Sequence, residues 1–194
     1  LHCLTVALHN YHDQYGSFPP AYIADEDGRP MHSWRVLILP YMERNDLYQA
    51  YDFNEPWDGP NNRKLAGINV REFSCPSDTG RLPTMTSYVA VVGPNTVWPG
   101  TQTTRLRSLS DGPSHTILLV EVVNSGIHWM EPRDLHVLQM APTINPTAGH
   151  GISSTHEGIV MVSYADGRQV PIPETISPEE LRAMLTRSGG EPIE

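Results

Sequence analysis

HEGIVMVSYADG, residues 156–167, contains the clearest strand and turn signals in the chain. Residues 159–165 place apolar groups on both alternating faces, as in a strand that is covered on both sides. Asp166-Gly167 then predicts a two-residue type I′ hairpin turn, because that turn needs positive φ at both central positions. Residues 168–173 should return as the second strand. Its two prolines lack an amide proton, so we expect this strand at a sheet edge.

A helix is predicted at the N-terminus, over residues 1–16. One stripe of apolar side chains, spaced by three and four residues, should face a core: Leu1, Leu4, Leu8, Tyr11 and Tyr15. A second stripe carries three histidines, for which we favour a solvated face over a metal site: His2, Thr5, His9 and His12. Gly16 is a suitable helix end, and Pro19-Pro20 prevents continuation.

The middle of the chain predicts short elements. Helices are expected at residues 34–39 and 46–51, capped by Ser33 and Asn45. Strands are expected at three further places: residues 70–75, 86–93 and 116–123. Ser177-Pro178-Glu179-Glu180 is a helix start, with serine as the cap and two carboxylates near the positive helix end.

A helix followed by strands predicts an α+β fold. Nothing resembling a flexible linker divides the 194 residues, so we expect one domain, residues 1–194, with long irregular loops. Its parts in chain order are the first helix, 1–16; loops and short helices, 17–69; an antiparallel sheet, 70–173; and a C-terminal helix, 177–188, ended by Gly189-Gly190.

The charge balance disfavours a nucleic-acid partner. The formal net charge is -9, and the lysine and arginine residues are scattered rather than clustered. Affinity for a phosphate backbone depends on clustered cations, and the same argument disfavours an anionic membrane surface. Two cysteines, Cys3 and Cys75, allow at most one disulfide.

Five segments stand out in this order along the chain: ALHNYHDQYGSFPPAY (7–22), FSCPSD (73–78), TSYVAVVG (86–93), DGPSHTILLVE (111–121) and His156-X9-Asp166-Gly167. Together they resemble a large paralogous family of bacterial pilin-like proteins of unknown function. The last segment is similar to the processing-associated H-X9-DG region of that family. We interpret His156, Asp166 and Gly167 as a structural signature.

The resemblance implies a pilin-like fold, in which an N-terminal helix packs on an antiparallel β-sheet. Full-length relatives carry a leader that a prepilin peptidase removes, and the first half of their helix is a membrane anchor. No apolar run in this sequence approaches the roughly 18 residues of a membrane span. We therefore expect residues 1–16 to be the C-terminal half of that helix, with the anchor half absent from this fragment.

The resemblance also implies a structural, non-enzymatic role. The protein would be a pseudopilin or minor pilin of a type II secretion or type IV pilus-like system. Its expected location is the cell envelope, on the exported side of the inner membrane or at the cell surface. Its partners would be other pilin-like subunits, bound through the N-terminal helix, and it would contact the membrane only through the missing anchor. Relatives often carry a cysteine just upstream of residue 1, whereas Cys3 departs from that pattern.

An alternative from a different class is a surface-displayed module that binds a ligand such as a carbohydrate. Three tryptophans lie near polar or turn residues, and sugar sites combine aromatic faces with amide and carboxylate groups. They are Trp57, Trp98 and Trp129. A tryptophan in a loop also serves as a lid over a core, and the sequence leaves both readings open.

Glu121 interrupts an apolar strand and is expected to be buried. A buried carboxylate must be paired, hydrogen-bonded, metal-bound or protonated. A structural partner is favoured over a metal ion, and a metal ion over an acid–base role. His150 and His156 could join Glu121 as zinc ligands, although no ligand spacing supports such a set.

No cofactor is expected, and calcium is the favoured alternative. Two oxygen-rich loops are of the kind that hard cations prefer, although neither matches an EF-hand. Their candidate ligands are Asp25, Asp27, Asp58 and Asn61. Motifs of the common hydrolase, nucleotide-binding and zinc-protease classes are absent, so no catalytic residues are predicted.

Overall fold

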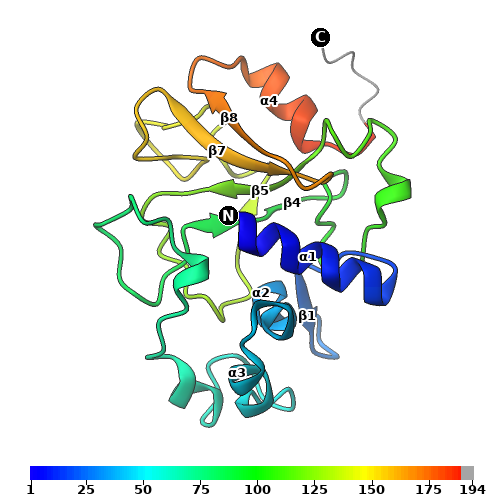
Figure 1. The fold of residues 1–194 in the computed structure, drawn as a ribbon, viewed down its shortest axis with the longest axis vertical. Coiled ribbons are helices and arrows are strands. Elements are labelled where there is room, and N and C mark those ends of the chain that lie inside the picture. Colours follow the sequence, from blue (N-terminus) through cyan, green and yellow to red (C-terminus); the bar gives the residue numbers. More distant parts are fainter. Residues whose placement is uncertain (189–194) are drawn as a thin grey trace.

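The computed structural model describes residues 1–188 and has an α+β architecture, as predicted (Figure 1). Its main sheet is antiparallel, with the strand order β3-β5-β7-β8. The strands are β3 (Tyr88–Val89), β5 (Ile117–Glu121), β7 (Ile159–Tyr164) and β8 (Gln169–Pro173). Helix α1 (His2–Tyr15) lies against this sheet, and α4 (Pro178–Leu185) follows β8.

Smaller elements surround the main sheet. Strands β1 (Tyr22–Ala24) and β2 (Pro30–Ser33) form an antiparallel pair, whereas β4 (Val91–Val92) and β6 (Leu135–His136) pair in parallel. The short helices are α2 (Trp34–Leu37), α3 (Asn45–Ala50) and the 3-10 turns η1 (Leu39–Met42), η2 (Asn62–Leu65), η3 (Arg71–Phe73) and η4 (Leu106–Ser108). The parallel pair departs from the wholly antiparallel sheet predicted for residues 70–173.

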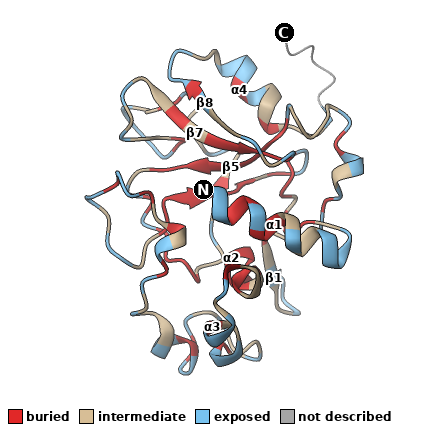
Figure 2. Ribbon diagram, viewed as in Figure 1, coloured by how far each residue is buried: buried red, intermediate tan, exposed pale blue. Residues whose placement is uncertain are grey.

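Two apolar clusters cover the two faces of the sheet. Leu119 belongs to the cluster that contains Leu4 and Leu8 of α1. The next residue, Val120, belongs to the cluster that contains Leu181 of α4. Because successive residues of a strand point to opposite faces, α1 and α4 cover opposite sides of the sheet. Figure 2 accordingly shows β5 and much of β7 as buried.

The buried face of α1 is rotated from the predicted stripe. Leu4, Ala7 and Leu8 are buried, and so is Thr5, which was assigned to the polar stripe. The Thr5 hydroxyl donates to Ser163 Oγ of β7 at 2.8 Å, which satisfies it inside the core. Tyr15 is 58% exposed instead of facing the core. The apolar periodicity located the helix. It did not predict the rotation of the helix about its axis, which places Thr5 beside Ser163 of β7.

The β7–β8 hairpin forms where predicted, with a different turn. Ser163 pairs with Gln169, so the loop is longer than two residues. Gly167 N donates to Tyr164 O at 3.0 Å, and Gly167 has φ 98°, whereas Asp166 is not among the residues with positive φ. This pattern fits a type I turn followed by a glycine bulge, not the predicted type I′ turn. Strand β8 is an edge strand, as its prolines predicted.

Replacing Gly167 by alanine is expected to lower the free energy of unfolding by about 1–2 kcal/mol, because a Cβ disfavours positive φ. Gly67 is the matched control, since its φ is not positive and a Cβ there would meet nothing within 4 Å. Gly67→Ala should therefore leave stability nearly unchanged. Urea unfolding of both variants measures the difference, and equal midpoints would contradict the role given to the Gly167 turn.

Two of the three predicted N-terminal caps are present. Ser33 Oγ accepts from Arg35 N, and Ser177 forms a full capping box with Glu180, as expected at both helix starts. Helix α3 begins at Asn45 itself, without a side-chain cap. Residues 70–75 were predicted as a strand but contain η3, which turns Phe73 into the core. Helix α4 ends at Leu185, and the predicted stop at Gly189-Gly190 lies outside the described residues.

A buried ion pair joins α2 to the segment before β6. Arg35 Nη2 donates to Asp134 Oδ1 at 2.5 Å, and the two side chains are 0% and 2% exposed. Asp134 also accepts from Trp34 Nε1 and from Ala90 N. Arg35 donates further to the carbonyl oxygen of Tyr88 at 3.2 Å. The pair thus connects α2 to the backbone of β3 and to Ala90, which lies between β3 and β4.

Candidate functional site

Cys75 is held in a tight turn that follows η3. Asp78 N donates to Cys75 O at 3.1 Å, which closes the turn within the segment FSCPSD. The Asp78 carboxylate accepts from Ser87 Oγ at 3.1 Å and from Asn124 N at 3.3 Å. These bonds fix the turn to the sheet ends beside β3 and β5. The Cys75 side chain is consequently buried, and Cys75 is 4% exposed.

Glu121 is the last residue of β5 and is 1% exposed. It pairs directly with Tyr88 of β3, so both side chains lie on one face of the sheet. That face also carries Leu119 and is the α1 side. Ile117, at the other end of β5, belongs to the opposite cluster, and the strand register shifts between Ile117 and Leu119.

His156 lies in the loop before β7, as predicted, and hydrogen bonds hold this loop against β5. Ser153 N donates to Glu121 O at 3.0 Å. Ser154 Oγ donates to Glu121 Oε2 at 3.0 Å and accepts from His156 N at 3.1 Å. Ser154 therefore orients the carboxylate and the histidine together.

The three side chains converge on one small volume. Cys75 Sγ lies 3.9 Å from His156 Nε2. One ligand atom of each of Cys75, Glu121 and His156 lies within 4.8 Å of the other two, and this is the one such group of three among residues 1–188. We call it the Cys-Glu-His cluster. Thiol, carboxylate and imidazole are all established metal ligands.

Burial dominates the electrostatics of the cluster. It raises the pKa of the Cys75 thiol, and the neighbouring Glu121 carboxylate raises that pKa further. Burial also raises the pKa of the Tyr88 phenol, with the Cys75 thiol as the next cause. Without a bound cation, the thiol is therefore held in its protonated form at neutral pH. Glu121 Oε1 is buried and has no hydrogen-bond partner among the described residues.

Of the three residues named as a possible zinc set, Glu121 and His156 belong to this cluster and His150 does not. His150 is exposed and lines a different hollow, beside Leu135 and Gln139. The histidines of α1 are used separately: His2 contacts Gln169, and His12 Nε2 accepts from Leu106 N. Cys3 and Cys75 are both free thiols and form no disulfide. Cys75 itself was not predicted as a ligand, although its segment had already been singled out.

Of the three candidate tryptophans, two are buried in the core and Trp57 is partly exposed. Trp98 and Trp129 are each 1% exposed, and their indole nitrogens donate to the carbonyl oxygens of Leu118 and Ile68. Because an apolar ring gains most from burial, both tryptophans fill the core instead of offering a ring face to a sugar. Trp57 is partly exposed and stacks on His128, with 5.6 Å between ring centroids.

Local contacts occupy two of the candidate ligand oxygens in the predicted calcium loops, Asp25 Oδ1 and Asn61 Oδ1. Asp25 Oδ1 accepts from the backbone N–H groups of Asp27 and Arg29, at 3.0 and 2.8 Å. Asn61 Oδ1 accepts from Lys64 Nζ at 2.9 Å, so a cation already sits beside it. Asp58 is exposed.

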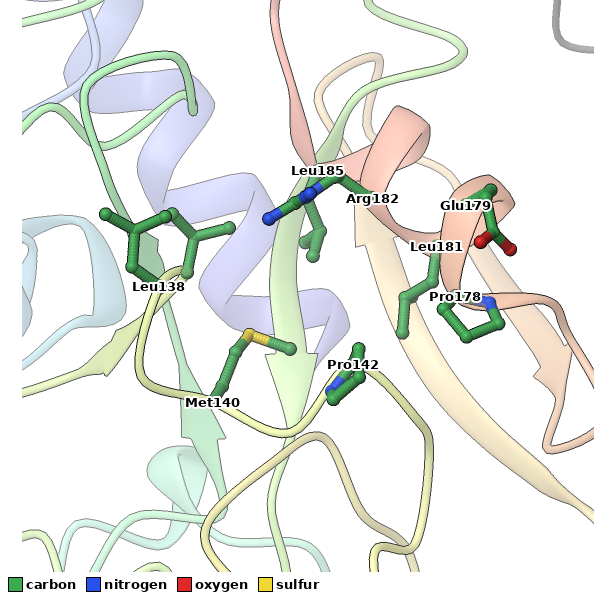
Figure 3. A pocket seen from close by; sticks show the side chains of 9 residues that line it. Leu138, Met140, Pro142, Pro178, Glu179, Leu181, Arg182 and Leu185 are labelled. Carbon is green, nitrogen blue, oxygen red and sulfur yellow. The ribbon is translucent and has the colours of Figure 1, made fainter.

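A surface pocket of about 310 Å³ lies between α4 and the loop that follows β6 (Figure 3). Met140 and Pro142 of the loop face Leu181 of α4 across it. The lining is largely apolar, with Glu179 and Arg182 as its charged members. No residue predicted from the sequence as a site residue lines this pocket.

A family model described as "Protein of unknown function (DUF1559)" matches residues 1–137. The chain belongs to the DUF1559 family. The matched part of this DUF1559 chain includes Cys75 and Glu121, whereas His156 lies beyond it. No curated protein and no solved structure matches the chain significantly. Over residues 1–188, no helix has both the length and the apolar character that crossing a bilayer requires.

Proposed function

We propose that this DUF1559 protein is a structural, pilin-like subunit of an envelope assembly, of the pseudopilin or minor-pilin kind. The proposal rests on the way α1 is placed. Its inner face packs on the protein's own antiparallel sheet through Leu4, Leu8 and the Thr5–Ser163 hydrogen bond. This is the arrangement expected from the resemblance to pilin-like proteins.

The outer face of α1 supports the same proposal. Its exposed residues follow a helical spacing: Cys3, Val6, Asn10 and Asp13. Val6 is 43% exposed although it is apolar. In a pilin-like assembly, this face would contact the helices of neighbouring subunits. We propose that upstream residues of the full-length protein extend the helix and anchor it in the inner membrane before assembly, in a type II secretion or type IV pilus-like system.

Replacing Val6 by aspartate tests the proposal, because the new carboxylate would be buried without a partner in a helix–helix contact. We expect the multimer fraction of the full-length protein to fall about tenfold or more, since each ~1.4 kcal/mol changes an association constant tenfold. Formaldehyde cross-linking in intact cells, followed by immunoblotting, measures this fraction.

Leu82→Asp is the matched control, since Leu82 is 65% exposed and lies on a separate loop. It introduces the same charge and should leave the multimer fraction unchanged. Circular dichroism of both purified variants checks that each is folded. If Val6→Asp forms as much multimer as Leu82→Asp, or if the parent protein forms none, the subunit proposal is wrong.

A further inference from the structure

The Cys-Glu-His cluster has close to the spacing that a metal ion requires. Ligand atoms on one tetrahedral zinc ion lie about 3.3–3.8 Å apart, given bonds of about 2.0–2.3 Å. The Cys75 Sγ to His156 Nε2 distance of 3.9 Å is almost within this range. All three ligand atoms lie within 4.8 Å of one another, so no pair is more than about 1 Å beyond the upper end of the tetrahedral range. Binding one ion would therefore require shifts of at most about 1 Å in the ligand atoms.

Glu121 gives an independent reason to expect a cation. The residue is 1% exposed, and its Oε1 atom has no hydrogen-bond partner among the described residues. Leaving a buried carboxylate oxygen unsatisfied costs free energy, which a ligated cation would remove. The other oxygen, Oε2, accepts from Ser154 Oγ at 3.0 Å. Hydrogen bonds of this kind orient the carboxylates that bind metals.

We propose that Cys75, Glu121 and His156 bind one divalent transition-metal ion, with Zn²⁺ as the expected ion. A thiolate and an imidazole are softer ligands than calcium or magnesium prefers, and they suit zinc. One thiolate and one carboxylate carry two negative charges, which a divalent ion neutralises. Coordination displaces the thiol proton of Cys75, which passes to solvent.

Three protein ligands leave a fourth position on a tetrahedral ion. His156 is partly exposed, so water can reach the ion from its side. A cysteine nucleophile is the competing reading of the same residues. It needs an accessible thiolate, whereas Cys75 is 4% exposed and burial raises its pKa. Metal binding also accounts for the buried Glu121 oxygen that has no hydrogen-bond partner among the described residues.

The ion would connect three distant parts of the chain. Cys75 follows η3, Glu121 ends β5, and His156 precedes β7. These residues come from three of the segments that carry the family resemblance, FSCPSD, DGPSHTILLVE and H-X9-DG. The site therefore gives His156 a specific role, as a ligand that fastens the 153–156 segment to the sheet. This inference is independent of the proposed assembly function.

Cobalt binding tests the site directly. Tag-free protein is stripped with a chelator, kept reduced, and titrated with Co²⁺ and then with Zn²⁺. We expect one ion per chain, an ultraviolet thiolate-to-cobalt charge-transfer band, loss of that band when Zn²⁺ displaces Co²⁺, and a Tm that rises with metal concentration. The band reports a cysteine ligand, so binding to surface histidines cannot produce it.

Substitutions then identify the ligands. Cys75→Ser, Glu121→Gln and His156→Gln should each weaken Co²⁺ affinity by about 100-fold or more. Ser154→Ala should weaken it by roughly 10- to 100-fold, as is typical of groups that orient a ligand. Cys3→Ser and His150→Gln are the matched controls, since both residues are exposed and lie outside the cluster. Both should bind Co²⁺ like the parent.

Three results would overturn the inference. The parent protein could show no thiolate–cobalt band at millimolar Co²⁺. The band could depend on Cys3 and survive Cys75→Ser. Glu121→Gln and His156→Gln could both retain the parent's affinity while their circular dichroism spectra remain native. The first measurement uses the unmodified chain, so it decides the question even where a variant fails to fold.

Discussion

Asp134→Ala is expected to lower the free energy of unfolding by about 3–5 kcal/mol, which is the usual cost of leaving a buried charge without its partner. The side chain of Arg35 is 0% exposed and donates to both oxygens of Asp134. The substitution also removes the acceptor for Trp34 Nε1 and Ala90 N. Urea unfolding, followed by tryptophan fluorescence and by circular dichroism, measures the loss.

Asp46→Ala is the control for this prediction. Asp46 is paired with Arg44 at 3.5 Å, but its side chain is 70% exposed. Exposed pairs contribute about 0–1 kcal/mol, so this variant should be nearly as stable as the parent. The double variant Arg35→Met, Asp134→Leu should recover much of the lost stability, because it removes both buried charges together. Equal losses for Asp134→Ala and Asp46→Ala would refute the argument.

Trp98→Ala is expected to cost about 3–5 kcal/mol of unfolding free energy, as for other large aromatic residues removed from a core. Trp98 is 1% exposed, and its ring centroid lies 5.3 Å from that of Trp34. Its indole N–H donates to Leu118 O at 2.7 Å, so the substitution also leaves a buried carbonyl oxygen without this donor. Thermal and urea unfolding measure the effect.

Trp57→Ala removes the same side chain from a partly exposed position, where the ring stacks on His128. It should lower the free energy of unfolding clearly less than Trp98→Ala does, because folding removes less apolar surface of Trp57 than of Trp98 from solvent. The comparison also bears on the carbohydrate alternative, which required accessible tryptophan rings. A Trp98→Ala variant as stable as Trp57→Ala would show that Trp98 is not the core residue described above.

Local sequence signals predicted the elements that depend on neighbouring residues. The caps at Ser33 and Ser177, the left-handed Gly16 at the end of α1 and the edge position of β8 all follow from backbone chemistry within a few residues. The hairpin was placed correctly for the same reason. Its turn type was not, because the turn type depends on strand register, which the pairing of β7 with β8 decides.

The candidate site was likewise predicted only in part from the sequence. Glu121 could be predicted as buried because it interrupts an apolar strand, and His156 stood out within H-X9-DG. Cys75 could not be assigned to them, since it lies 46 residues before Glu121 and 81 before His156 in the sequence. Metal sets are recognised in a sequence by short spacings between pairs of ligands, and no such spacing links these three residues.

The sequence by itself determined that this chain has an α+β fold, where its capped helices begin, and that one buried carboxylate needs a partner. Only the tertiary structure decided which face of α1 is buried, that Trp98 and Trp129 belong to the core, and that Cys75 and His156 meet Glu121. The physical reason is the range of the interactions. Caps and turns are satisfied by near neighbours, whereas burial and a three-residue cluster depend on segments that only the folded sheet brings together.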